Sequence, residues 1–141
     1  MPMIRYRTRD ITALVTEPCL CGRTLRRIKR ITRRTDDMII IRGVNVYPAQ
    51  IESALLRVEG TLPHYQIVLS RVRDLDEMEV EVEVTPAVFG DTVGALEQVQ
   101  QKLTAGIEKA IGLRAKVRLV QPHTIQRSQG KAKRVIDNRK M

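Results

Sequence analysis

The stretch from Arg34 to Pro48 sets tight limits on the structure of this chain, because it carries several local folding signals in one order. Two adjacent carboxylates precede the apolar run Met38–Ile41. Arg42-Gly43 separates this run from Val44–Val46, which predicts a tight hairpin whose glycine has a positive φ. The proline then fits the first turn of a helix. We interpret this segment as a joint, followed by a mobile hairpin and a helix start.

The rest of the body alternates between strand and helix periods. Residues 65–72 are rich in β-branched side chains, and residues 78–84 alternate strictly between apolar and acidic ones, so one face of this strand should be buried and the other wet. A turn is expected at Asp74–Asp76. Apolar residues recur at spacings of three and four over residues 92–111, as on one face of a helix. With a helix that begins at Pro48 and a strand over 115–120, the order predicts an α+β sandwich: a small sheet with helices on one face, preceded by the hairpin.

The head of the chain differs from this self-sufficient body. The patterns over residues 4–8, 11–16 and 24–32 predict short strands. Such strands are too few to bury a core of their own. We therefore expect residues 1–35 to be the edge of a larger structure, and residues 36–141 to be a separate domain.

Composition narrows the class of protein. Apolar residues make up 43% of the 141, but with one Phe and no Trp the core must be aliphatic. No stretch reaches the apolar length of a membrane span. The N-terminus lacks the apolar middle of a signal peptide, so a cytoplasmic location is expected.

Charge is distributed unevenly along the chain. The formal net charge is +9, of which residues 1–35 carry +8 and residues 36–141 carry +1. A basic head on an α+β sandwich can indicate a nucleic-acid-binding module. It can equally indicate a face that meets an anionic ligand or an acidic partner. Tyr6 is the only aromatic residue in the head, which leaves little for base stacking.

Cys19 and Cys21 are separated by one residue in a turn-like segment that ends in Gly22. A structural disulfide is not expected in the cytosol. Two readings stay open: two reduced thiols in a turn, or two thiolates on one metal. Zinc takes four ligands, and His64 and His123 are the other candidates that the chain offers.

Four segments, taken together in this order, carry a resemblance to a known family. They are Tyr6-Arg7-Thr8-Arg9-Asp10, residues 34–48, Pro63-His64-Tyr65-Gln66 and residues 128–134, which read S-Q-G-K-A-K-R. They resemble the end of an acyl-adenylate-forming enzyme of the phenylacetate–coenzyme A ligase family. The resemblance covers essentially the whole chain. It implies that residues 1–35 are the last strands of a large N-terminal domain and that residues 36–141 are a mobile C-terminal lid domain.

The resemblance implies an AMP-forming acid–thiol ligase of phenylacetate catabolism. Such a ligase joins a carboxylate to ATP with the help of Mg²⁺, giving an acyl-AMP and pyrophosphate. Coenzyme A then attacks the acyl-AMP and AMP leaves. The small domain swings between two poses, one for each half-reaction.

Site residues follow from the same resemblance. Lys131 matches the lysine that reaches the substrate carboxylate and the α-phosphate during adenylation. Asp36 matches the hinge, Asp10 the carboxylate that binds the ribose hydroxyls, and Arg34 the arginine beside the nucleotide. The loop that lines the coenzyme A channel in the thioester-forming pose is matched by Gly43, Val44, Asn45, Tyr47 and Pro48.

The residue types suit these roles. A carboxylate only accepts hydrogen bonds and can take two, which fits a vicinal diol. Two anions, the attacking carboxylate and the α-phosphate, need a compact cation on a flexible stem to bring them together, as a lysine provides. Gly130 before this lysine allows its loop to close and withdraw. A hinge has to absorb a large backbone rotation, for which a short polar side chain is suited.

The resemblance also shows departures and implies missing parts. Arg9 and Arg33 stand where related enzymes often have glycine. The phosphate-binding loop, the acyl pocket and most of the adenine site belong to the N-terminal domain that the chain lacks, so we expect no activity from this chain alone. That domain is the expected partner, in cis or in trans through the basic head, and a homodimer is left open. In some relatives the Cys-x-Cys pair completes a zinc site with ligands from the missing domain, which would make Cys19 and Cys21 half a site.

Two other classes of function remain as alternatives. The first is the nucleic-acid-binding module indicated by the basic head, for which a steep salt dependence of binding would be the sign. The second is a small-ligand sensor, which would depend on analogy with other sandwiches alone.

Overall fold

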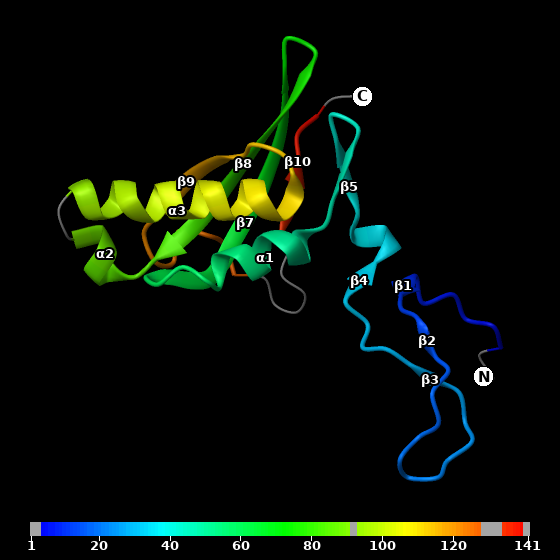
Figure 1. Cartoon of the computed structure of the whole chain (residues 1–141). Coiled ribbons are helices and arrows are strands. Elements are labelled where there is room, and N and C mark those ends of the chain that lie inside the picture. The colour runs from blue at the N-terminus through cyan, green and yellow to red at the C-terminus, as the bar shows by residue number, and fades with distance from the viewer. Residues whose placement is uncertain (1–3, 91–92, 128–133, 140–141) are drawn as a thin grey trace. The chain divides into compact units, whose positions relative to one another are not determined.

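A computed structural model of the chain describes residues 4–90, 93–127 and 134–139. The chain divides into two compact units, one that ends at Met38 and one that begins at Ile39. Figure 1 traces the chain in colour from the N-terminus to the C-terminus, and each unit is described by itself below.

The N-terminal unit consists of two-residue strands in two antiparallel pairs. β1 (Asp10–Ile11) pairs with β4 (Arg33–Arg34), and β2 (Leu14–Val15) pairs with β3 (Arg27–Ile28). A 3₁₀ turn, η1 (Thr35–Asp37), follows. The expectation of a strand over residues 4–8 is wrong, and the strands expected over 11–16 and 24–32 shrink to two residues each. None of residues 4–38 is buried. The alternation of apolar and polar residues in this segment therefore does not mark a strand face that packs on a core.

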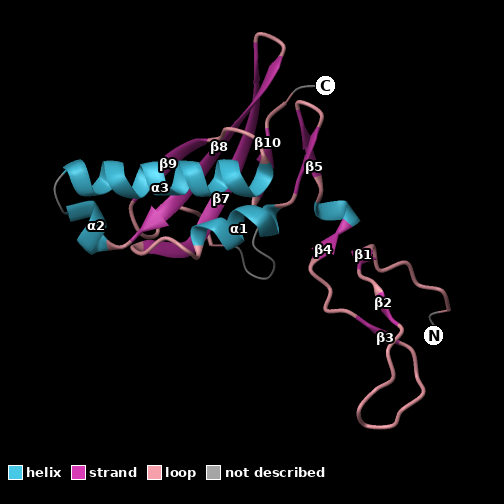
Figure 2. Ribbon diagram, in the orientation of Figure 1, coloured by secondary structure: helices cyan, strands magenta, loops and turns pink. Residues whose placement is uncertain are grey.

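The C-terminal unit is built on a four-stranded mixed sheet with the order β10-β7-β8-β9. The long strands β7 (Thr61–Val72) and β8 (Leu75–Val84) form the antiparallel centre. β9 (Lys116–Val120) lies parallel to β8, and β10 (Val135–Asp137) lies parallel to β7. Figure 2 shows these strands behind the helices.

Helices α1 (Pro48–Leu55) and α3 (Val93–Ile111) pack against each other and against this sheet, which confirms the α+β class predicted from the sequence. On α3 the buried part of the predicted stripe is Leu103, Ile107 and Ile111. These side chains meet the apolar face of β8, where Met78, Val80 and Val82 are buried, in one core cluster. The core is aliphatic except for Tyr65, as the composition requires.

The predicted hairpin is present as β5 (Ile39–Ile41) and β6 (Val44–Val46), two antiparallel strands joined by Arg42-Gly43. Both turn residues have positive φ, +48° and +77°, the combination that matches the twist of two-residue hairpins. Ile39, Ile41 and Val46 join the main core, whereas Ile40 faces solvent.

Several element boundaries differ from the sequence-based expectation. The turn between the long strands is at Arg73-Asp74, both with positive φ, because Leu75 and Asp76 already pair with β7. A short helix, α2 (Pro86–Gly90), precedes α3. β10 lies in the polar tail, where the pattern indicates no strand, because three residues are too few to show a period.

Candidate functional site

Three residues with expected roles meet in the N-terminal unit. The β1–β4 pairing places Asp10 opposite Arg34. Arg34 Nε lies 3.7 Å from Asp10 Oδ1, and Arg34 Nη2 donates to Asp36 Oδ2 at 2.9 Å. The structure therefore brings together the residues that were expected to bind ribose, to lie beside the nucleotide and to form the hinge.

Local backbone geometry holds this cluster. Arg9 has a φ of +64°, and its carbonyl accepts hydrogen bonds from Thr35 N at 2.8 Å and Thr35 Oγ1 at 3.2 Å. This left-handed conformation is one that glycine adopts readily and that other residues adopt rarely. Arg34 Nε is buried without a hydrogen-bond partner. The Asp10 residue is half-buried, and the 3.7 Å between Arg34 Nε and Asp10 Oδ1 makes this contact an ion pair rather than a hydrogen bond.

The residues expected to line the coenzyme A channel follow one another along the hairpin and into α1. Gly43 is at the exposed tip, Val44 is half-buried, and Asn45 is exposed. Tyr47 N donates to Gln50 Oε1 at 3.0 Å, which caps the first turn of α1. Pro48 is the first residue of that helix.

Lys131 lies outside the described residues, but both flanks of its segment are anchored to the sheet. On the upstream side, Glu83 is fully buried and accepts hydrogen bonds from Ile125 N at 3.0 Å and Arg127 Nη2 at 2.8 Å. Burial alone would raise the pKa of Glu83, but these hydrogen bonds outweigh it and hold the pKa below its ordinary value. The alternating pattern predicts a wet face at this position, so that prediction is wrong for Glu83.

On the downstream side, Arg134 is the anchor. Its Nη1 donates to Glu52 Oε2 and, at 3.1 Å, to the Tyr65 hydroxyl, and its guanidinium lies 4.9 Å from the centroid of the Tyr65 ring. The Tyr65 hydroxyl donates to Pro48 O at 3.2 Å. Burial raises the pKa of Tyr65 to about 12 despite the neighbouring arginine. This cluster links the end of the lysine segment to the start of α1.

The sequence motifs contain Tyr65 and Arg134 without indicating their structural role. The alternating pattern places Glu83 on the wet face, and no motif includes Glu52. The pairs are separated by 82 residues for Arg134 with Glu52 and by 44 for Arg127 with Glu83. No local pattern reports such pairs.

The cysteines lie in the β2–β3 loop with their sulfur atoms 2.9 Å apart, and both are free thiols. The contact with Cys19 lowers the pKa of the Cys21 thiol, and the backbone N–H of Arg23 acts in the same direction. The thiolate is the form that binds metals. Within the described part of the chain no group of three or more His, Cys, Asp or Glu side chains can hold a metal ion.

A groove of about 680 Å³ lies between α1 and α3. Its floor includes Ala54, Val58 and Gly106, and Arg57, Lys102 and Lys109 contribute positive charge to its lining. None of the site residues expected from the sequence lines it.

Comparison with known proteins defines the class. Residues 43–139 match the family model described as the AMP-binding enzyme C-terminal domain. Because this match spans more than half of the chain, the chain belongs to that family of C-terminal domains of adenylate-forming enzymes. In the described residues, no helix is long and apolar enough to cross a membrane.

Individual relatives are more specific. The phenylacetate–coenzyme A ligase of Thermus thermophilus is 44% identical over 99% of this chain, which covers 34% of that protein. A 2-hydroxyisobutyryl-CoA ligase in the post-adenylation state, in complex with an acyl-AMP, is 38% identical with a TM-score of 0.82, covering 97% of this chain and 29% of that one. The same enzyme with coenzyme A in the thioester-forming state has a TM-score of 0.70 and 38% identity, covering 98% of this chain and 29% of that one. This chain spans about a third of the length of the curated relatives that it matches.

Proposed function

We propose that this chain is the C-terminal part of an AMP-forming phenylacetate–coenzyme A ligase. The observation that supports this most is the similarity along 99% of the chain to ligases of that name. In the proposed reaction, a carboxylate oxygen attacks the α-phosphorus of ATP and pyrophosphate leaves. The sulfur of coenzyme A then attacks the acyl carbon, the bond to AMP breaks, and the thioester is released.

The roles expected from the sequence are part of this proposal. Lys131 supplies the positive charge for adenylation, and Asp10 with Arg34 binds the nucleotide. Gly43, Val44, Asn45, Tyr47 and Pro48 line the channel for coenzyme A. Arg34 contacts both Asp10 and Asp36, so one guanidinium joins the proposed nucleotide contact to the expected hinge. This cluster supports the nucleotide-binding roles of Asp10 and Arg34.

We further propose a domain boundary at Asp36, with the lid domain from there to the C-terminus. Two poses of this lid, one for each half-reaction, fit a relative whose structures are described as post-adenylation and thioester-forming. Asp36 lies in the 3₁₀ turn directly before the hairpin. A rotation at this turn would leave each unit internally unchanged, as hinge motions do.

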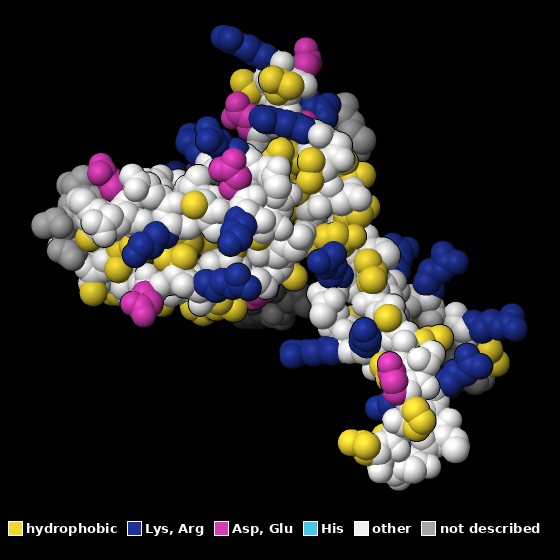
Figure 3. Space-filling view, viewed as in Figure 1, with side chains coloured by type: hydrophobic (Ala, Val, Ile, Leu, Met, Phe, Trp, Pro, Cys, Tyr) yellow, Lys and Arg dark blue, Asp and Glu magenta, His cyan; other side chains and the backbone are white. Residues whose placement is uncertain are grey.

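The partner in this proposal is the remainder of the ligase, in cis or in trans. The N-terminal unit has no buried residue among those described and exposes apolar side chains that a larger domain would cover, including Ile4, Leu14, Leu20 and Leu25. Figure 3 shows Lys and Arg side chains over the same unit. Because the chain belongs to a ligase family, we assign this surface to the missing domain rather than to nucleic acid.

Metals and location complete the proposal. Mg²⁺ would accompany ATP in the adenylation step. Cys19 and Cys21 would give zinc two of its four ligands, with the other two from the missing domain. The proposed location is the cytoplasm, where a structural disulfide between the two cysteines is not expected. The homodimer that the sequence left open stays a prediction.

A chimera tests this function. This chain replaces the matching third of the Thermus thermophilus ligase, and acyl-CoA formation from ATP, phenylacetate and coenzyme A is measured. We expect thioester formation by the chimera and none by this chain alone, because about two thirds of the relative's length is absent from it. Lys131→Ala should lower the rate of phenylacetate-dependent ATP–pyrophosphate exchange by about 10²–10³.

The matched control is Lys133→Ala, two residues along the same basic segment. It should leave exchange within about twofold, since the resemblance assigns no contact with the substrate to this second lysine. An active chimera in which Lys131→Ala exchanges pyrophosphate at the unsubstituted rate would contradict the catalytic role. Turnover by the isolated chain would contradict the proposed incompleteness.

A further inference from the structure

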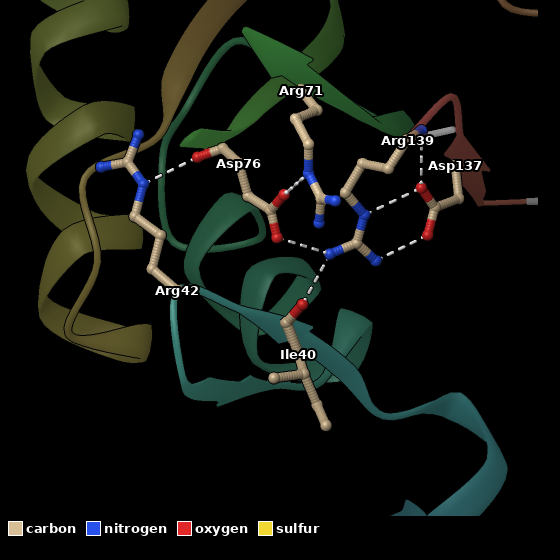
Figure 4. Close-up of polar contacts among 6 residues, drawn as sticks. All are labelled: Ile40, Arg42, Arg71, Asp76, Asp137 and Arg139. Carbon is tan, nitrogen blue, oxygen red and sulfur yellow. Dashed lines mark hydrogen bonds and ion pairs between the residues drawn. The ribbon is translucent and has the colours of Figure 1, made fainter. Parts of the chain in front are cut away.

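Asp76 lies at a junction of three parts of the C-terminal unit that are distant in sequence. Its carboxylate accepts hydrogen bonds from Arg71 Nε on β7 at 2.9 Å and from Arg139 Nη1 after β10 at 2.9 Å. Its backbone carbonyl accepts a third bond, from Arg42 Nε in the hairpin turn, at 2.7 Å. Figure 4 shows these contacts to the carboxylate and to the backbone carbonyl of Asp76.

Arg139 extends the junction to the first strand of the hairpin. Its Nη1 also donates to Ile40 O at 2.7 Å, and Nε and Nη2 bind Asp137 at 2.9 and 2.6 Å. The side chains of Arg139 and Asp76 are 17% and 14% exposed, so the bond between these two residues is partly shielded from competing water. A guanidinium that binds two carboxylates and a carbonyl is fixed in plane and direction.

The hairpin needs such a fixation because its own contacts are one-sided. Ile39, Ile41 and Val46 bury one face in the core, while Arg42 and Gly43 at the tip are exposed. An isolated two-stranded hairpin is marginally stable in water. The contacts from Arg42 to Asp76 and from Arg139 to Ile40 are hydrogen bonds that join the outer part of the hairpin to the sheet.

We propose that Asp76 and Arg139 position the β5–β6 hairpin for the coenzyme A half-reaction. This inference depends on the proposed function, in which Gly43, Val44, Asn45, Tyr47 and Pro48 line the coenzyme A channel. Asp76 and Arg139 are positioning residues in it: they act on the channel through Arg42 and Ile40 and contact no substrate. A hairpin tip that loses this support shifts or fluctuates relative to the reacting thiol, and small displacements of this kind cost large factors in rate.

A role in stability alone leads to a different expectation. If the cluster only held the fold together, its loss would lower both half-reactions in the same proportion, because it would reduce the amount of folded lid. A positioning role lowers the thioester-forming step while adenylation continues. The two half-reactions therefore separate the alternatives.

The experiment uses the active chimera with Asp76→Asn, which removes the charge and turns one acceptor into a donor facing a guanidinium. We expect kcat/KM for coenzyme A to fall by about 10- to 100-fold, and ATP–pyrophosphate exchange with phenylacetate to stay within about twofold. Arg139→Lys should have the same signature, because lysine keeps the charge but not the planar fork.

Glu79→Gln is the matched control. Glu79 is also on β8 and also pairs with two cations, Lys116 at 3.6 Å and Arg118 at 3.2 Å, but among the contacts found for it none reaches the hairpin. It should leave both half-reactions unchanged. Hydrogen exchange of the isolated chain gives a second measurement: the hairpin amides should exchange faster in Asp76→Asn, and those of α3 should not.

The inference is overturned if Asp76→Asn and Arg139→Lys keep the unsubstituted kcat/KM for coenzyme A, or if both half-reactions fall equally. It is also overturned if the hairpin amides exchange at the unsubstituted rate. An unsubstituted chimera that makes no acyl-CoA is a different outcome, since it contradicts the proposed function itself.

Discussion

Tyr65 is the residue whose chemistry the fold alters most clearly. Its side chain is 4% exposed, and burial raises its pKa to about 12. A raised pKa in the folded chain means that the neutral phenol stabilises the fold below the ordinary value of about 10, and that this contribution is lost as the pH rises through about 12. We expect a late step in tyrosinate absorbance near pH 12, and Tyr65→Phe should abolish it.

The control at this position is Tyr6→Phe. Tyr6 is 68% exposed in the N-terminal unit, so its loss should leave the late step in place. A step near pH 12 that survives in Tyr65→Phe would show that another group titrates there.

At the same scale, the sequence predicts residues whose roles follow from local geometry. Gly43 was expected at positive φ and has +77°, and Pro48 was expected to begin a helix and does. Glu83 shows the opposite case. The pattern assigns it to solvent, but the carboxylate is buried because Arg127, far along the chain, folds back onto it. Partners at long range carry no local signal.

The secondary-structure elements also divide into those that local sequence signals predict and those that depend on distant partners. The hairpin, the start of α1 and the stripe of α3 are predicted almost to the residue, since turn chemistry, a proline and a 3.6-residue period are local. β10 was missed because its three residues gain their strand conformation from pairing with Ile67, Val68 and Leu69. The strands predicted for the N-terminal unit are longer than the two-residue strands observed. None of the described residues in this unit is buried, so no packed face stabilises longer strands. In the candidate site, the sequence places Asp10 in one motif and Arg34 with Asp36 in another, and only the β1–β4 pairing brings Asp10 to Arg34.

The segment that follows β9, residues 121–127, gives a prediction for stability. Glu83 holds it through Ile125 N and Arg127, so Glu83→Ala leaves a buried N–H and a guanidinium without their acceptor. The free energy of unfolding should fall by about 1–3 kcal/mol, measured by urea denaturation at pH 7. Because the pKa of Glu83 is lowered in the fold, its contribution is present above the ordinary value of about 4.3 and disappears as the pH falls through the lower, folded value.

Glu79→Gln again provides the comparison, as an ion-paired carboxylate whose side chain is 28% exposed on the same strand. Its effect should stay below about 1 kcal/mol. Equal losses for the two variants would mean that burial and the backbone bond to Ile125 add nothing to the anchor.

For the whole molecule, the decisive property is that the core belongs to one unit. Every residue of the hydrophobic cluster lies at or beyond Ile39, while residues 4–38 include none that is buried. Strand pairs of two residues without a covered face are weak, so their amides should exchange at nearly the rate of an unfolded chain. The amides of β7 and β8 should exchange only through global unfolding of the C-terminal unit.

Hydrogen exchange followed by mass spectrometry measures both regions in one experiment. A truncated chain that begins at Ile39 should keep the exchange of β7 and β8 and unfold within about 0.5 kcal/mol of the full chain, because the removed residues contribute no buried apolar surface. In the chimera, residues 4–38 should become protected, since the proposed partner covers Ile4, Leu14, Leu20 and Leu25. Strong protection of these residues in the isolated chain would mean that the unit folds without a partner. Absence of protection in an active chimera would mean that the missing domain does not cover this surface.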